Sequence, residues 1–84
     1  MERKIRILIV EDEYNLCNIL KILLEANNYK ITTTNNGKDA LAILAEQTFE
    51  VAILDVHLPD MLGTNIMVDA KSRMSDIIVI IITG

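Results

Sequence analysis

The chain has 84 residues, of which 51% are hydrophobic and 24% charged, and its formal net charge is −4 at pH 7. This length allows one small domain, and the composition is that of a globular rather than a disordered chain. The negative charge argues against nucleic-acid binding, and no apolar run is long enough to span a membrane. The single cysteine, Cys17, cannot form an internal disulfide, which is typical of a reducing, cytoplasmic location.

The first part of the chain is predicted to form a strand, a helix and a second strand. Residues 5–10 are an apolar, mostly β-branched run that favours a buried strand. Residues 14–26 predict an amphipathic helix that ends at Asn27 and Asn28, because asparagine tolerates left-handed backbone. The predicted buried face of this helix consists of apolar residues at helical spacing: Leu16, Ile19, Leu20 and Leu23. Residues 29–34 alternate more and contain three threonines, as expected for a strand near a sheet edge.

A turn at residues 35–37 leads into a second predicted helix. Asn36 is expected to cap this helix, which extends to about Gln47. Its predicted buried face contains Ala40, Leu41 and Leu44. Residues 49–54 then form an apolar run that suits a short strand covered on both faces.

The last part of the chain predicts one more helix and one more strand. Apolar residues recur at helical spacing after Gly63, and residues 77–82 form the most hydrophobic strand. The complete order is therefore β-α-β-α-β-α-β. This alternation predicts an α/β fold with parallel strands, right-handed crossovers and helices on both faces of the sheet.

Three of the four predicted strands are followed directly by polar side chains. Glu11 and Asp12 follow the first strand, Asp55 the third and Thr83 the fourth. The carboxyl ends of parallel strands meet at one rim, which is where open α/β sheets bind ligands. Two carboxylates about 5 Å apart repel by roughly 3 kcal/mol at an effective dielectric of 20, so such a cluster needs protons or a cation. Hard oxygen ligands at an open rim favour Mg²⁺.

Asp55 also opens a distinctive loop. Pro59 prevents the strand from continuing, and Gly63 is expected to permit a backbone turn. A carboxylate beside Mg²⁺ can attack phosphorus to form an aspartyl phosphate, with Thr83 donating a hydrogen bond to the incoming group. His57, the only histidine, is expected to be an exposed side chain rather than a ligand. The alternative is that the rim acids are only solvated strand ends.

The sequence resembles the receiver domain of two-component response regulators. The resemblance covers the whole chain and rests on ILIVEDE at residues 7–13, NNGKDAL at 35–41, DVHLPDMLG at 55–63 and IIITG at 80–84. It implies a flavodoxin-like, three-layer α/β/α fold with a parallel sheet of strand order 2-1-3-4. It also implies a signalling module rather than an enzyme with turnover.

The same resemblance implies a role for each rim residue. Asp55 is implied to be the phospho-acceptor, which receives a phosphoryl group from a sensor histidine kinase or a phosphotransfer protein. Glu11, Asp12, Asp55 and the backbone carbonyl of His57 are implied to hold Mg²⁺. Thr83 is implied to be the switch hydroxyl that follows the phosphoryl group.

The end of the sequence departs from the family pattern. Family members continue through a fourth helix, a fifth strand and a fifth helix, and a lysine closes the fifth strand, whereas this sequence stops after the fourth strand. Neither Lys38 nor Lys71 is at a predicted strand end. We therefore expect residues 1–84 to be a single receiver domain truncated at its C-terminus, with slow or undetectable phosphorylation. The last strand, Ile77 to Ile82, is expected to be an unprotected edge that pairs with a second copy in a homodimer.

Two other functions are consistent with parts of the sequence. Phosphatases of the haloacid-dehalogenase kind also use an aspartate nucleophile, but they need a second acid two residues later, where this chain has His57. A receiver-like interaction or dimerisation module would keep the sheet without being phosphorylated.

Overall fold

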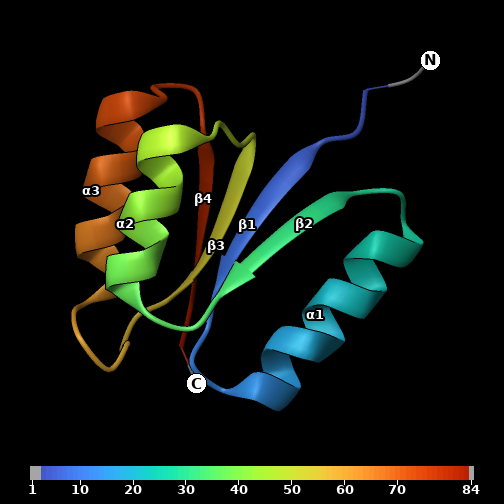
Figure 1. Cartoon of the computed structure of the whole chain (residues 1–84), viewed down its shortest axis with the longest axis horizontal. Coiled ribbons are helices and arrows are strands. Elements are labelled where there is room, and N and C mark those ends of the chain that lie inside the picture. Colours follow the sequence, from blue (N-terminus) through green and yellow to red (C-terminus); the bar gives the residue numbers. More distant parts are fainter. Residues whose placement is uncertain (1–2, 84) are drawn as a thin grey trace.

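Four parallel strands in the order β2-β1-β3-β4 form the central sheet of the computed structural model, which describes residues 3–83 (Figure 1). The elements in chain order are β1 Arg6–Val10, α1 Tyr14–Ala26, β2 Lys30–Thr34, α2 Gly37–Glu46, β3 Val51–Asp55, α3 Gly63–Arg73 and β4 Ile78–Ile82. The predicted fold class and strand order are confirmed. None of the helices in the described part of the chain has the length and apolar character needed to cross a bilayer.

The sheet separates two packed layers. α2 and α3 lie side by side on one face, and α1 covers the other (Figure 1). The larger core, under α2 and α3, includes Leu8, Val10, Ala40, Leu44, Ala52, Leu54, Ile66 and Ala70. The smaller core, under α1, consists of Ile7, Ile9, Cys17 and Ile53. Because successive strand residues point to opposite faces, β1 and β3 supply both cores, and this accounts for their continuous apolar runs.

The strand register brings the carboxyl ends of the strands to one rim. Val10 of β1 pairs with Thr34 on one side and with Leu54 on the other. Asp55, the last residue of β3, pairs with Ile82, the last residue of β4. The residues that follow these strands therefore start from neighbouring positions, although they are far apart in the sequence.

Every strand begins one or two residues later than expected, and two of the apolar residues that precede the strands are Phe49 and Ile77. Phe49 lies before β3, and Ile77 lies before β4, where its N–H donates to the Met74 carbonyl in a turn. Both side chains are nevertheless buried. Their apolar character reflects packing at the amino ends of the strands rather than pairing within the sheet.

The buried face of α1 was predicted only in part. Leu16 and Leu20 are half-buried, but Ile19 and Leu23 are exposed, and Cys17 and Leu24 contribute to the inner face instead. The helix rests on the sheet along a stripe narrower than its apolar surface, so apolar spacing alone does not identify the residues in contact.

The predicted helix boundaries at asparagine residues are confirmed. Asn28 has a positive φ of 69°, and the Asn27 side chain donates to the Leu23 carbonyl at 2.8 Å. Asn36 caps α2, because its side-chain oxygen accepts a hydrogen bond from the Asp39 N–H at 2.8 Å.

Candidate functional site

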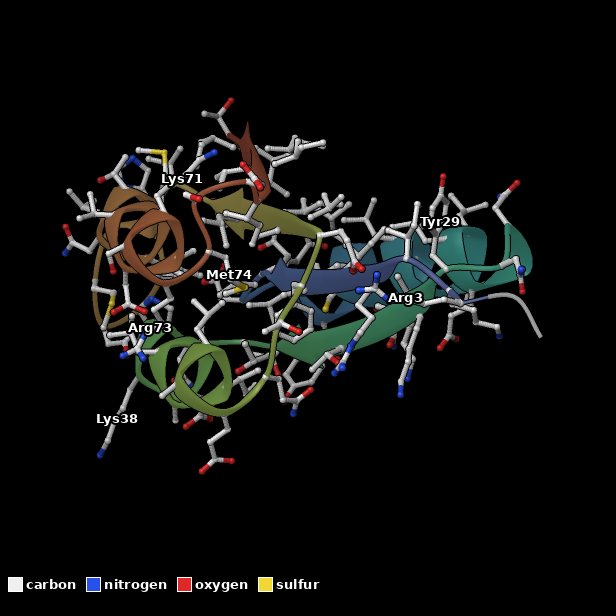
Figure 2. The ribbon with its side chains drawn as sticks, turned by 90° about the horizontal axis from the view of Figure 1, so that it is seen from above. Arg3, Tyr29, Lys38, Lys71, Arg73 and Met74 are labelled. Carbon is white, nitrogen blue, oxygen red and sulfur yellow. The ribbon has the colours of Figure 1, made fainter. Side chains whose placement is uncertain are left out.

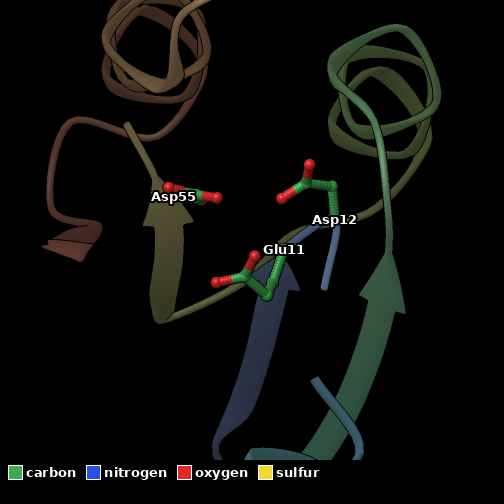
Figure 3. Close-up of side chains that lie close together, drawn as sticks. All are labelled: Glu11, Asp12 and Asp55. Atoms are coloured by element: carbon green, nitrogen blue, oxygen red, sulfur yellow. The ribbon is translucent and has the colours of Figure 1, made fainter. Parts of the chain in front are cut away.

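Three carboxylates from two strand ends meet at the rim of the sheet. Glu11 and Asp12 follow β1, and Asp55 ends β3 (Figure 3). One carboxylate oxygen from each residue lies within 4.8 Å of the other two. The structure therefore brings together the acids that the sequence places at strand ends, and this spacing would allow all three to contact one cation.

Burial and backbone contacts orient two of these acids. Glu11 is 3% exposed and Asp55 is 7% exposed, whereas Asp12 is open to solvent. An oxygen of Glu11 accepts a hydrogen bond from the Glu13 N–H at 3.0 Å. Asp55 Oδ1 accepts from the His57 N–H at 3.3 Å. Each buried carboxylate thus has one backbone donor, which leaves acceptor capacity for a further ligand.

The electrostatics of the cluster favour a cation. Burial raises the pKa of Glu11, and the nearby carboxylates of Asp55 and Asp12 raise the pKa of Glu11 further. The hydrogen bond from the Glu13 N–H lowers it and so opposes these effects. Charged carboxylates within 4.8 Å repel by about 3 kcal/mol per pair at an effective dielectric of 20. A bound cation would remove both the repulsion and the cost of burying negative charge. The donor set is entirely oxygen, as hard divalent ions require.

A small depression lies over the acids. Its volume is about 250 Å³, and its lining residues are Glu11, Asp12, Glu13, Leu16, Asp55 and His57. The His57 side chain is exposed, as expected. A larger depression of about 570 Å³ lies at the opposite rim, near Met74 and Arg73, and contains none of the three acids (Figure 2). The smaller depression is the candidate site because it has the convergent polar groups.

Close packing at Gly63 fixes the start of α3 beside Asp55. The Gly63 N–H donates to the Val56 carbonyl at 2.7 Å. A Cβ at Gly63 would overlap the backbone carbonyl oxygen of Asp55. Within residues 3–83 no glycine has a positive φ, so Gly63 does not supply a left-handed backbone. It is required for close approach, not for a left-handed turn.

Thr83 lies at the same rim as the acids. It follows Ile82, which pairs with Asp55 and accepts a hydrogen bond from the Val56 N–H at 3.1 Å. Its side chain is exposed. This position is compatible with the role that the resemblance implies, and that role stays a prediction.

Asp60, in the loop that follows Asp55, was not among the residues predicted for the site. Its two carboxylate oxygens accept hydrogen bonds from the N–H groups of Gly37 and Lys38, both at 2.8 Å. These two bonds lower the pKa of Asp60. An aspartate after a proline is typical of a local turn, so nothing in the residue pattern indicated partners more than twenty positions away.

The chain matches one protein family over nearly its whole length. A sequence model of the family described as response regulator receiver domain matches residues 7–84. The response regulator SaeR of Staphylococcus aureus (strain USA300) is 34% identical over 78 residues, which cover 93% of this chain and 34% of SaeR. The chain thus spans about a third of the length of the curated relatives that it matches.

Solved structures are similar in fold. A CheY-like receiver domain protein from Methanospirillum hungatei JF-1 matches with a TM-score of 0.94 and 30% identity, over 98% of this chain and 66% of that protein. The response regulator TrrA of Thermotoga maritima, in complex with Mg²⁺–BeF, matches with a TM-score of 0.87 and 32% identity. The match covers 94% of this chain and 69% of TrrA.

Proposed function

Because the chain belongs to the family of response regulator receiver domains, we propose that it is a phospho-accepting module of a two-component system. Asp55 receives the phosphoryl group from a phosphohistidine of a sensor histidine kinase or a phosphotransfer protein. The observation that carries this proposal is the meeting of three carboxylates at one rim, with Asp55 at the end of a buried strand. The module is a switch rather than an enzyme with turnover.

The residues at the rim suit Mg²⁺. Glu11, Asp12 and Asp55 would hold the ion, together with the backbone carbonyl of His57. When bound, Mg²⁺ neutralises charge on the cluster and on the incoming phosphoryl group. The similar protein TrrA, whose solved structure is a complex with Mg²⁺–BeF, supports this choice of ion.

The chain's own residues orient the reacting carboxylate. The His57 N–H holds Asp55 Oδ1, and the other oxygen stays available as the nucleophile. A new bond forms between this oxygen and phosphorus, while the bond from phosphorus to the donor's histidine nitrogen breaks and that nitrogen takes up a proton. The Thr83 hydroxyl, at the end of the neighbouring strand, donates a hydrogen bond to the transferred group.

The lysine of the family pattern has no replacement at Lys38 or Lys71. The Lys38 side chain points away from the molecule, and Lys71 Nζ donates to the carbonyl of Ile77 at the opposite end of β4 (Figure 2). Without a cation from lysine, the charge of the transition state is less well neutralised. We therefore expect residues 1–84 on their own to be phosphorylated slowly.

Mass spectrometry after incubation with Mg²⁺ and a small-molecule phosphodonor tests the proposal. The expected result is one added phosphoryl group, located on Asp55 and absent when Mg²⁺ is chelated. The matched control is Asp55→Asn, which keeps the size and hydrogen-bonding capacity of the side chain. A phosphoryl group that persists in Asp55→Asn, or that lies on another residue, would refute the assignment.

A second candidate function, assembly through a sheet edge, rests on β4. Ile78 is 61% exposed and Ile80 is 46% exposed on the edge strand. They lie on the same face as Ile82, which packs against the core under α1. We propose that a second copy of the chain pairs with this edge in a homodimer. The two functions are compatible, because the edge and the acidic rim are different surfaces.

A further inference from the structure

We propose that Asp60 is a positioning residue for the acidic site. In this proposal its carboxylate fastens the loop after Asp55 to the start of α2, and this contact sets where Asp55 and the His57 carbonyl lie. The inference rests on the proposed function, because it assigns a role toward the same Mg²⁺ site.

The geometry at the start of α2 shows two different caps. Asn36, the residue before the helix, accepts from the Asp39 N–H, which is a local contact. Asp60 comes from a different part of the chain and accepts from the first two N–H groups of the helix, those of Gly37 and Lys38. These N–H groups have no partner within a helix, and the helix dipole favours a negative charge there. The Asp60 carboxylate therefore holds the two N–H groups at the start of α2 that the Asn36 cap leaves without a partner.

A second contact reinforces the attachment of the loop. Met61, the residue after Asp60, packs directly on Gly37, and a Cβ at Gly37 would overlap the Met61 side chain. The neighbouring N–H group of Leu58 donates to the Met61 carbonyl at 3.2 Å within the loop. Two adjacent loop residues thus dock on the same helix start, one by hydrogen bonds and one by packing.

The start of α2 is in turn attached to the other wall of the acidic site. The Asn35 side-chain N–H donates to the Glu11 carbonyl at 2.9 Å, and the Glu11 N–H donates to the Thr34 carbonyl at 3.1 Å. Residues 34–38, from the end of β2 to the first turn of α2, therefore contact Glu11 on one side and the loop of Asp55 on the other. Through this segment, Asp60 holds the two walls of the site at a fixed separation.

Metal affinity tests this role better than stability does. We expect Asp60→Ala to weaken Mg²⁺ binding about tenfold, as does the loss of other groups that orient metal ligands. Binding is followed by NMR titration of the amide signals of Asp12 and His57, and hydrogen exchange at Gly37 and Lys38 reports whether the cap is lost. Asp60→Asn retains one acceptor oxygen and is expected to give an intermediate affinity. This second variant also serves if Asp60→Ala does not fold.

Two control variants separate positioning from other effects. Asn36→Ala removes a cap from the same helix without touching the loop, so its Mg²⁺ affinity is expected to match that of the unmodified chain. Asp39→Asn removes one negative charge at the same helix start and is likewise expected to leave the affinity unchanged. Equal losses in Asp60→Ala and Asp39→Asn would assign the effect to charge and overturn the proposal. So would an unchanged affinity in Asp60→Ala once exchange shows that its cap is lost.

The proposal and the proposed function can fail separately. If the unmodified chain does not bind Mg²⁺, the proposed function fails. The positioning role is then tested without metal, by comparing the amide signals of residues 55–57 between Asp60→Ala and Asn36→Ala. Displaced signals in Asp60→Ala alone would support the role, and identical signals in both variants would overturn it.

Discussion

The backbone carbonyl of Asp55 lies so close to the Cα of Gly63 that no other side chain fits between them. The contact joins the proposed phospho-acceptor to the first residue of α3, at the closing end of the loop. It means that α3 cannot come closer to the end of β3 without displacing Asp55.

We therefore predict that Gly63→Ala is strongly destabilising. The added methyl group would overlap backbone rather than a flexible side chain, and overpacking of this kind costs about 1–3 kcal/mol. Urea denaturation measures the loss, and Thr64→Ala, at the exposed neighbouring position, is the matched control. Equal stability of the two variants would show that the loop accommodates a side chain at residue 63.

Asp12→Ala is predicted to weaken Mg²⁺ binding by at least about tenfold, since loss of a direct ligand should cost no less than loss of an outer partner. Asp12 is exposed, so its removal leaves no buried cavity and should change stability little. Calorimetric or NMR titration gives the affinity. An unchanged affinity would mean that the three acids do not form one metal site.

Glu11 is predicted to make stability depend on pH in the absence of metal. Its pKa is raised above the ordinary value of 4.5, mainly by burial. The stability that it contributes is therefore fully present below that value and is lost as the pH rises through the raised pKa. Glu11→Gln should thus be more stable than the unmodified chain at pH 7, and this difference should vanish in acid.

Mg²⁺ provides the control for the Glu11 prediction. Saturating Mg²⁺ should stabilise the unmodified chain more than Glu11→Gln, because the variant has lost a charged ligand. Thermal unfolding at several pH values gives the stability of the unmodified chain and of Glu11→Gln, each with and without Mg²⁺. If the variant is the less stable protein at pH 7 without metal, burial of the Glu11 charge is not costly.

The sequence predicted those features of the fold and the site that depend on a short stretch of neighbouring residues. β1 and β3 are visible as apolar runs because both of their faces are buried, and Glu11 and Asp55 stand out because they end those runs. The contact of Asp60 with Gly37 was not predictable, because it depends on how two distant loops pack. Ile19 was predicted to be buried but is exposed for a related reason. Periodicity identifies the apolar face of α1, but it does not show how much of that face the sheet covers.

The last prediction concerns the edge strand β4. Within the described residues β4 pairs only with β3, and it contains no proline, lysine or other charge that would discourage pairing with another chain. Burying an exposed isoleucine is worth about 1.5–3 kcal/mol, so pairing that covers Ile78 and Ile80 would favour association. We expect sedimentation to show a dimer at tens of micromolar, and Ile80→Lys to be monomeric. Val68→Lys, at an exposed position on α3, should remain a dimer. A sharp, folded monomer of the unmodified chain would show that the edge needs no partner.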